Sequence, residues 1–320
     1  MKYLNEADLQ TLGVNWDETI GVIDAALSSL ADGDYAQPIK PYLRYRNLKN
    51  RIIAMPAFVG GKINTAGIKW IASFPDNIHA GIPRANCAVI LNDADTGEIK
   101  SIINTGLISS IRTASVSGWM LKKYLEFRQP EKVNLGIIGW GPIGRQHFQM
   151  ATHILGERLN QIYLYDLHDI DKQTAAYPDK DRITIADGWQ EVYKNSDIFI
   201  TCTVSAASYI EGKPRAGALY LNVSLRDFKV SIYDFFKDNT IVDDWEEICR
   251  ERTDIENLHL EKGLQKEQTK SIVDIWKEGL KPVPADAPLF FNPMGMAVFD
   301  IAIGYYYYKS AAEKNRGVDL

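Results

Sequence analysis

The stretch at residues 133–155, VNLGIIGWGPIGRQHFQMATHIL, is the most informative part of this 320-residue chain. An apolar run at residues 135–138 leads into the glycine-rich turn GWGPIG, and a helical pattern begins directly after it. The run is typical of a buried parallel strand, and the turn has the glycine spacing that joins such a strand to a helix. Free N–H groups at the start of that helix, together with its dipole, favour phosphate binding. The stretch therefore predicts a dinucleotide-binding fold.

Each glycine of the turn has a separate role in this prediction. Gly139 allows the sharp turn after the strand, Gly141 lets the backbone approach a pyrophosphate, and Gly144 lets helix and strand pack closely. A cofactor bound there would contact the whole turn, which consists of Gly139, Gly141, Pro142, Ile143 and Gly144.

A second apolar run, at residues 162–165, ends in Asp166, which lies 22 positions after Gly144. An acidic residue about 20 positions after the turn accepts hydrogen bonds from the adenosine ribose hydroxyls of a dinucleotide. A carboxylate there also repels a 2′-phosphate, so the pattern favours NAD over NADP. The alternative is that Asp166 is an ordinary turn or capping residue.

The composition is that of an ordinary globular protein, with 46% hydrophobic and 24% charged residues. A net charge of −5 provides no basic surface for nucleic acid or an anionic membrane. No apolar run approaches the ~20 residues that span a bilayer, and the N-terminus lacks a secretion signal. The three cysteines and five histidines are scattered, which predicts neither a disulfide framework nor a metal site. We expect a cytoplasmic protein without metal.

The first hundred residues differ in pattern from the dinucleotide fold. Residues 16–31 have helical periodicity, with Asn15 or Asp17 positioned to cap the helix start. Two prolines within residues 37–44 favour an extended edge. Strands separated by turn residues are expected at 51–58, 66–74, 88–91 and 99–104. These features predict a helix followed by a mostly antiparallel sheet, in a domain of its own.

Two cations near this region have an unusual sequence environment. Lys69 is flanked by apolar residues, so it lies either on the solvent face of a strand or in a pocket; the pattern alone favours the solvent face. Arg112 lies in the first turn of a helix predicted at residues 109–127, where a cation opposes the helix dipole. That position indicates a compensating anion, either a bound carboxylate or phosphate or an acidic side chain elsewhere in the chain.

Beyond Asp166 the strands continue to alternate with helices, which predicts a doubly wound parallel sheet. A long final helix is expected after a break at residues 292–295. The expected strands lie at 182–185, 198–201, 218–223, 240–242 and 289–291. Thr203, Val204 and Ser205 come shortly after the second of these strands, where open α/β sheets have their ligand-contacting loops.

Asp227 is the acid with the clearest potential for chemistry. It follows the apolar strand at residues 218–223, at the edge of the sheet where a nicotinamide is expected to lie. In that position a carboxylate would act as a general base or bind a substrate ammonium. The alternative is that Asp227 caps the next turn.

Four features of the chain are similar to the ornithine cyclodeaminase/μ-crystallin family. They are GIKW at 67–70, SIRTA at 110–114, GWGPIG at 139–144 and Asp227, and they span most of the chain. Within the family, the chain resembles the N-(2-amino-2-carboxyethyl)-L-glutamate dehydrogenases. That closer resemblance rests on QPIKPYLR at 37–44, RIIAMP at 51–56, ITCTV at 200–204, VDDW at 242–245 and NPMGMA at 292–297.

The resemblance implies a homodimer of two-domain subunits with an α/β fold. A Rossmann-type, doubly wound parallel sheet at residues 114–293 would bind NAD. An α+β domain for substrate binding and dimerisation, discontinuous in sequence, would combine residues 1–113 and 294–320.

The resemblance also implies roles for individual residues. Lys69 and Arg112 match the family's binders of substrate carboxylates. Lys40 and Arg44 match basic positions of the same pocket. Asp227 matches the catalytic aspartate, and Lys69 would be a second catalytic residue. Besides Asp166 and the loop at 203–205, the implied cofactor contacts are Arg112, Thr113, Ser224, Asn292 and Met294.

The implied reaction on this small amino-acid substrate is an NAD-dependent oxidative cleavage of N-(2-amino-2-carboxyethyl)-L-glutamate. Its products would be 2-oxoglutarate and L-2,3-diaminopropionate, a precursor of siderophores or related metabolites. Ornithine cyclodeaminases continue from the catalytic aspartate with Cys-Pro-Gly-Lys, whereas this chain has Phe228-Lys229-Val230, which favours the dehydrogenase branch. The alternatives are an ornithine cyclodeaminase or related amino-acid or imine dehydrogenase, and a non-catalytic binding protein like μ-crystallin. The presence of Asp227 argues against the non-catalytic alternative.

Overall fold

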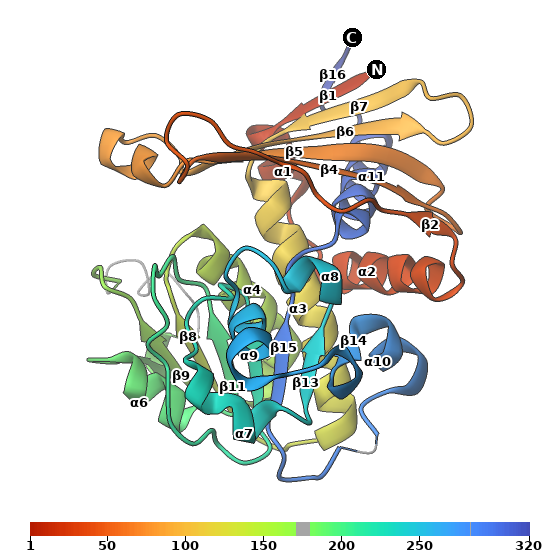
Figure 1. Ribbon diagram of the computed structural model, residues 1–320. Coiled ribbons are helices and arrows are strands. Elements are labelled where there is room, and N and C mark those ends of the chain that lie inside the picture. Colours follow the sequence, from red (N-terminus) through yellow and green to blue (C-terminus); the bar gives the residue numbers. More distant parts are fainter. Residues whose placement is uncertain (171–179, 282) are drawn as a thin grey trace. The chain divides into compact units, whose positions relative to one another are not determined.

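The computed structural model describes residues 1–170, 180–281 and 283–320 of the chain, which divides into two compact units (Figure 1). Unit 1 consists of Met1–Val116 and Gly295–Leu320, and unit 2 consists of Ser117–Met294. The sequence prediction had the corresponding boundaries after residues 113 and 293. Unit 1 is discontinuous, because its last segment follows the whole of unit 2 in the chain.

The sheet of unit 2 has eight described strands, and all of their pairings are parallel. In spatial order they are β10 (Ile183–Ile185), β9 (Leu159–Tyr165), β8 (Val133–Ile138), β11 (Ile198–Thr201), β12 (Leu219–Asn222), β15 (Leu289–Asn292), β13 (Thr240–Val242) and β14 (Lys270–Ser271). From β8 the chain adds strands first on one side and then, from β11, on the other. The predicted doubly wound, Rossmann-type α/β fold is confirmed, with its switch point between β8 and β11.

Helices cover both faces of this sheet (Figure 1). One face carries α4 (Pro142–Leu155) and the second half of α3 (Leu107–Arg128), and the other carries α6 (Trp189–Asn195), α7 (Tyr233–Phe236) and α9 (Asp254–Lys262). Two further helices are α8 (Trp245–Ile248) and α10 (Ile272–Glu278). On the face with α7, Phe228 packs edge-on against Phe236 and Phe290. Strands β11 and β12 are buried along their whole length, because both faces of the sheet are covered.

The sheet of unit 1 is mostly antiparallel, as predicted, and only β1 and β7 pair in parallel. In spatial order its described strands are β16 (Val318–Asp319), β1 (Lys2–Asn5), β7 (Ile99–Asn104), β6 (Ala85–Asp93), β5 (Thr65–Ser73), β4 (Arg51–Val59) and β2 (Tyr35–Ala36), with β3 (Tyr42–Leu43) also paired to β4. Strands β1 and β16 were not predicted, because they are too short to show an alternation of apolar and polar residues.

The helices of unit 1 lie on one side of its sheet (Figure 1). They are α1 (Glu6–Leu12), α2 (Trp16–Ala31), the first half of α3 and α11 (Ala297–Glu313). The Asn15 side chain caps the start of α2, in agreement with the sequence prediction. Helix α11 is buried along most of its first half, because it packs against both the sheet and α2. No helix in the described part of the chain is long and apolar enough to cross a membrane.

Lys69 lies on the helix-covered face of this sheet. It pairs in register with Met55 on β4 and with Val89 on β6, and all three residues are buried. The interpretation favoured by the pattern alone, that Lys69 lies on the solvent face, is therefore wrong. Its neighbour Trp70 points to the opposite face and is 44% exposed, because successive side chains of a strand alternate between faces.

Candidate functional site

The glycine turn between β8 and α4 has the shape that a dinucleotide phosphate requires. Gly139 has a φ of +92°, and a Cβ there would lie 2.5 Å from the backbone that follows β11. A Cβ on Gly144 would lie 2.0 Å from the carbonyl oxygen of Gly139, so only glycine permits this close approach. Gly141 precedes α4, which opens with Pro142 and Ile143 and has no side-chain cap. The N–H groups at this helix start remain available to an anion, which fits the pyrophosphate of NAD.

Asp166 lies directly after β9 and fixes the glycine turn. Its Oδ2 accepts a hydrogen bond from the Trp140 N–H at 2.5 Å, and its Oδ1 accepts one from the His168 N–H at 2.9 Å. The carboxylate thus has the turn-stabilising role that was the alternative interpretation. Each carboxylate oxygen has a second lone pair, so ribose hydroxyls can still donate to Asp166.

Replacing Asp166 with serine is expected to weaken NADH binding by about 10-fold to 100-fold. We also expect a smaller preference of the chain for NADH over NADPH. The change removes hydrogen bonds to a charged acceptor, which are worth about 1.5–3 kcal/mol each, and the charge that repels a 2′-phosphate. Fluorescence titrations with NADH and NADPH measure both effects, and Asp181→Ser, at an exposed acid of unit 2, is the control. An unchanged preference between the two cofactors would show that Asp166 is only structural.

The loop at residues 203–205, predicted to contact the cofactor, follows β11 at the switch point of the sheet. Val204 in this loop is 66% exposed. The Thr203 hydroxyl accepts a hydrogen bond from the Ser205 N–H at 3.3 Å. The loop is therefore located at the sheet edge where open α/β folds bind ligands.

Three other predicted cofactor contacts have partners within their own units. Asn292 is fully buried, and its amide donates to a carbonyl of its own strand and accepts from the amide of Asn222. The Asn292 side chain is thus used inside the sheet, and the contact of this residue with the cofactor stays a prediction. The Met294 N–H donates to the carboxylate of Asp243 at 2.9 Å. The Thr113 hydroxyl donates to a carbonyl one turn earlier in α3.

Asp227 follows β12 and is a fully buried carboxylate. The Thr203 hydroxyl donates to its Oδ1 at 2.5 Å, and the Ser224 hydroxyl donates to its Oδ2. Ser224, a predicted cofactor contact, thus directs its hydroxyl to Asp227. Burial raises the pKa of Asp227 above its ordinary value, although hydrogen bonds from neighbouring hydroxyls oppose the rise. A carboxylate with a raised pKa is a stronger base, and its bonds to hydroxyls contradict the alternative role as a turn cap.

A second buried acid, Asp254, anchors the loop that carries Asp227. Its Oδ2 accepts hydrogen bonds from the backbone N–H groups of Asp227 at 3.1 Å and Phe228 at 3.2 Å. The same oxygen accepts from the Asn222 amide at 2.9 Å. Burial raises the pKa of Asp254 to about 6. Asp254 was not predicted from the sequence, because an acid after Thr253 resembles an ordinary first-turn residue of a helix.

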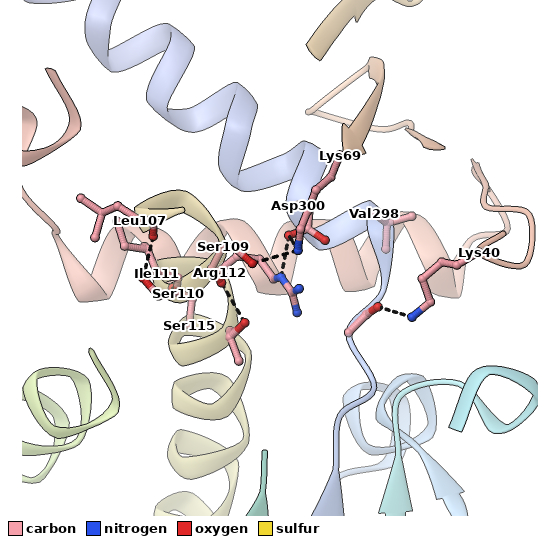
Figure 2. A network of polar contacts seen from close by, with 12 residues as sticks. Lys40, Lys69, Leu107, Ser109, Ser110, Ile111, Arg112, Ser115, Val298 and Asp300 are labelled. Carbon is pink, nitrogen blue, oxygen red and sulfur yellow. Dashed lines mark hydrogen bonds and ion pairs between the residues drawn. The ribbon is translucent and has the colours of Figure 1, made fainter. Parts of the chain in front are cut away.

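In unit 1 three side chains from distant parts of the chain form one buried network (Figure 2). Lys69 on β5 donates from Nζ to Asp300 Oδ1 at 3.0 Å and to the Ser109 hydroxyl at 2.9 Å. Arg112 on α3 donates from Nε to the same Asp300 oxygen at 2.7 Å. The side chains of Lys69 and Asp300 are both only 2% exposed. The predicted pair Lys69 and Arg112 is therefore brought together, around an acid on α11.

Asp300 was missed by the sequence analysis, although a signal was present. It is the only charged residue within residues 296–308, an otherwise apolar stretch. A lone acid on a buried helix needs a cation or a hydrogen-bond donor, because burying an unpaired charge is costly. The pattern could thus have predicted a buried partner for Asp300, but not which one.

The expected position of Arg112 within its helix was wrong. Helix α3 begins at Leu107, so Arg112 lies in the second turn, where the dipole argument no longer applies. Its compensating anion is Asp300, which corresponds to the alternative of an acidic side chain of the chain itself. Gly295 has a φ of +92°, which favours glycine, and a Cβ there would lie 2.7 Å from Arg112 Nη1.

Lys40 and Arg44 were predicted to contribute to one pocket, but their surroundings differ. Lys40 is buried, and its Nζ donates to the carbonyl oxygen of Gly295 at 2.9 Å (Figure 2). Arg44 is exposed, donates from Nη1 to the carbonyl oxygen of Leu48 at 3.0 Å, and lies over the ring of Tyr42. The structure does not bring Arg44 into the buried network, because β3 ends one residue earlier and an exposed loop follows.

The network of unit 1 holds more positive than negative charge. Burial lowers the pKa of Lys69, the Asp300 carboxylate opposes this, and Arg112 adds to the lowering. Lys69 and Arg112 carry two positive charges and share the single carboxylate of Asp300. Such a site can bind an anion, since a carboxylate ligand would offset the excess. Within the described residues no group of His, Cys, Asp and Glu could hold a metal ion.

Comparisons with known proteins agree with these features. Residues 5–315 match the model of the ornithine cyclodeaminase/mu-crystallin family. The chain is 33% identical to N-((2S)-2-amino-2-carboxyethyl)-L-glutamate dehydrogenase of Staphylococcus aureus (strain NCTC 8325 / PS 47), with 100% of this chain and 98% of that protein covered.

Two solved structures have a similar fold. One is Thermococcus litoralis Delta(1)-pyrroline-2-carboxylate reductase in complex with NADH and L-proline, with a TM-score of 0.90, 22% identity and 100% of both chains covered. The other is an archaeal alanine dehydrogenase dimer with bound NAD, with a TM-score of 0.86, 21% identity, and 100% of this chain and 98% of that chain covered. At these identities the likeness concerns the fold alone.

Proposed function

The chain belongs to the ornithine cyclodeaminase/mu-crystallin family, and from this membership we propose that it oxidatively cleaves N-(2-amino-2-carboxyethyl)-L-glutamate. It is an NAD-dependent oxidoreductase that acts on CH–NH bonds. The specific substrate is the proposed part, and the dehydrogenase of Staphylococcus aureus supports it. The observation that carries the proposal is that two buried cations of unit 1, Lys69 and Arg112, share one carboxylate, that of Asp300.

The charges of unit 1 suit a substrate with several carboxylates. N-(2-amino-2-carboxyethyl)-L-glutamate has three carboxylates and a bridging secondary amine. We assign the binding of these carboxylates to Lys40, Lys69 and Arg112, which can form charge-assisted hydrogen bonds with them. Exposed Arg44 belongs to the same basic segment as Lys40, and we assign it a contribution to attracting the anionic substrate.

The residues of unit 2 suit the chemistry at the amine. The glycine turn before α4 and Asp166 would hold NAD, which would supply the oxidising power as the acceptor of a hydride from the glutamate-derived α-carbon. Asp227 accepts the proton of the bridging amine as the carbon–nitrogen double bond forms. Asp227 then returns this proton to the imine nitrogen, and the restored carboxylate takes a proton from the water that adds to the imine carbon. Collapse of the carbinolamine breaks the carbon–nitrogen bond and releases 2-oxoglutarate and L-2,3-diaminopropionate. Lys69, as a second catalytic residue, stabilises the charge of the reacting carboxylate.

The proposed product, L-2,3-diaminopropionate, is a building block, and we propose that the chain supplies it for siderophores or related metabolites. We also propose that the enzyme works in the cytoplasm. The three cysteines are free thiols, as is usual for proteins in a reducing compartment.

The decisive experiment is incubation of the purified chain with N-(2-amino-2-carboxyethyl)-L-glutamate and NAD. We expect NADH formation, with 2-oxoglutarate and L-2,3-diaminopropionate detected by mass spectrometry in equal amounts. Turnover of ornithine to proline instead would assign the chain to the cyclodeaminases. Reduction of a cyclic imine with NADH would assign it to the imine reductases, and NADH binding without any turnover would indicate a binding protein like μ-crystallin.

We further propose that the chain acts as a homodimer formed through the sheet of unit 1. The face opposite the helices carries an apolar row across four strands, in which Pro56, Ile68, Ile90 and Ile102 pair in register. Trp70 lies on the same face and is 44% exposed. A partly exposed apolar surface of this kind is typical of a subunit interface.

Replacing Trp70 with glutamate is expected to convert the dimer into a monomer. The side chain is already half exposed, so unit 1 should tolerate the change, whereas two charges facing each other across a symmetric interface would repel. Size-exclusion chromatography with light scattering measures the mass of the wild-type chain and the variant. Lys62→Glu, at an exposed turn of the same unit, is the control. A wild-type monomer, or a dimeric variant, would contradict this interface.

A further inference from the structure

We propose that Asp300 is a positioning residue, which fixes Lys69 and Arg112 in the geometry that binds a substrate carboxylate. The inference rests on the carboxylate-binding role proposed above for these two cations. Figure 2 shows Lys69 and Arg112 converging on the Asp300 carboxylate from β5 and α3. The sequence around Asp300 indicates only that it is a buried acid.

The hydrogen bonds of Asp300 are concentrated on one oxygen. Oδ1 accepts from Lys69 Nζ at 3.0 Å and from Arg112 Nε at 2.7 Å. Oδ2 is buried and has no hydrogen-bond partner among the described residues. Leaving a buried carboxylate oxygen without a donor costs free energy, so a residue kept for stability alone would pair both oxygens. The arrangement favours precise placement of the two cations over maximal stability.

The pairing through Nε leaves the other end of the guanidinium for a ligand. Asp300 binds Arg112 only through Nε, and within the described residues neither Nη1 nor Nη2 of Arg112 has a hydrogen-bond partner. Gly295 lies beside this end, since a Cβ there would lie 2.7 Å from Nη1, and glycine has no side chain that could cover it. The two terminal nitrogens form the fork that binds a carboxylate with two parallel hydrogen bonds. Asp300 thus determines which edge of Arg112 is presented.

Asp300 also favours the charged form of Lys69. The charged or titratable groups that act on Lys69 are Asp300 on α11, Arg112 on α3 and Cys87 on β6. Burial and Arg112 lower the pKa of Lys69, and the Asp300 carboxylate is the largest opposing influence. Without that negative charge, Lys69 would lose its proton at a lower pH. A carboxylate ligand would then lose one of its cations as the pH rises.

The test measures binding of 2-oxoglutarate, a dicarboxylate, to the full chain saturated with NADH. For Asp300→Asn we expect a Kd raised at least tenfold at pH 8 and by a smaller factor at pH 6, because loss of the Asp300 charge lowers the pKa of Lys69 further. NADH affinity, which depends on unit 2, should stay within twofold of wild type. Asp319→Asn, at an exposed acid of unit 1 that pairs with Lys2, is the control. A purely structural role of Asp300 would not produce recovery at low pH.

A second variant keeps the inference testable if Asp300→Asn does not fold. Asp300→Glu retains the charge but moves the oxygens by one methylene, so we expect a folded chain with a Kd raised at least fivefold at both pH values. A wild-type Kd for either variant across this pH range overturns the inference, as does a wild-type chain that does not bind 2-oxoglutarate. Because this assay needs no turnover, a failure of the proposed reaction would be seen separately in the substrate assay.

Discussion

Asp227→Asn is expected to lower kcat by at least about 100-fold while NADH binding stays within twofold of wild type. General-base catalysis by a positioned side chain contributes about 10²-fold to 10⁴-fold, and an amide cannot accept the proton of the substrate amine. Asparagine has nearly the same size, so the buried loop after β12 should keep its shape. The hydroxyl of Thr203 can still donate to the Oδ1 position.

The effect is measured as kcat with the proposed substrate and as the Kd of NADH by fluorescence titration. Asp234→Asn, at an exposed acid on α7 of the same unit, is the matched control and should leave both values unchanged. A near-normal kcat for Asp227→Asn would remove this residue from the mechanism. A loss of NADH binding would mean that Asp227 supports the nucleotide site instead.

Asp254→Asn is expected to stabilise the chain above pH 6 while lowering kcat about tenfold. Burial raises the pKa of Asp254 to about 6, from the 3.8 that is ordinary for an aspartate in water. Above pH 6 the carboxylate is ionised in both the folded and the unfolded chain, and the folded chain bears the full cost of burying it. At about 1.4 kcal/mol per pKa unit, that cost is on the order of 3 kcal/mol. A neutral amide of the same shape avoids it.

The sign of the pH dependence shows whether the added stability of Asp254→Asn comes from removing the buried charge of Asp254. As the pH falls through 6, wild-type Asp254 becomes protonated in the folded chain, and the difference in unfolding free energy between variant and wild type shrinks. The difference vanishes near pH 3.8, where Asp254 of the unfolded chain also takes up a proton. Urea unfolding at pH 8 and at pH 4.5 measures the difference, again with Asp234→Asn as the control. A variant that is less stable than wild type at pH 8 would show that the four hydrogen bonds to the Asp254 carboxylate outweigh the cost of burial.

The loss of kcat expected for Asp254→Asn has a different cause. The carboxylate holds the backbone N–H groups of Asp227 and Phe228 in one place. An amide accepts these hydrogen bonds more weakly than a charged oxygen does. The loop would therefore hold the Asp227 carboxylate less firmly. Natural proteins often keep such unfavourable buried groups where function requires them, at a cost in stability.

The dinucleotide turn could be predicted from one stretch of sequence, because its requirements are local. Gly139 and Gly144 are needed where a strand, a turn and a helix follow one another within a few residues, and steric contact excludes other side chains there. The cap of α2 by Asn15 is equally local. The order of buried strands and helices after Asp166 was sufficient for the parallel sheet, because apolar runs of strand length mark each strand.

The side of the sheet on which Lys69 lies could not be predicted in the same way. Alternation identifies the buried face of a strand only when the other face is polar. Here Ile68 and Trp70 make one face of β5 apolar, and Ile71 is apolar beside Lys69 on the other, so each face resembles a buried one. Packing of α11 against one face decides the matter.

The partners of the buried charges depend on tertiary structure alone. Asp300 lies 231 positions from Lys69 and 188 positions from Arg112, and no local pattern relates residues so far apart. Asp254 resembled a helix-start residue until folding brought it under the loop of Asp227. Local sterics and periodicity therefore account for the elements and their order. The energy of a buried charge depends instead on the groups around it, and only the folded chain brings those groups together.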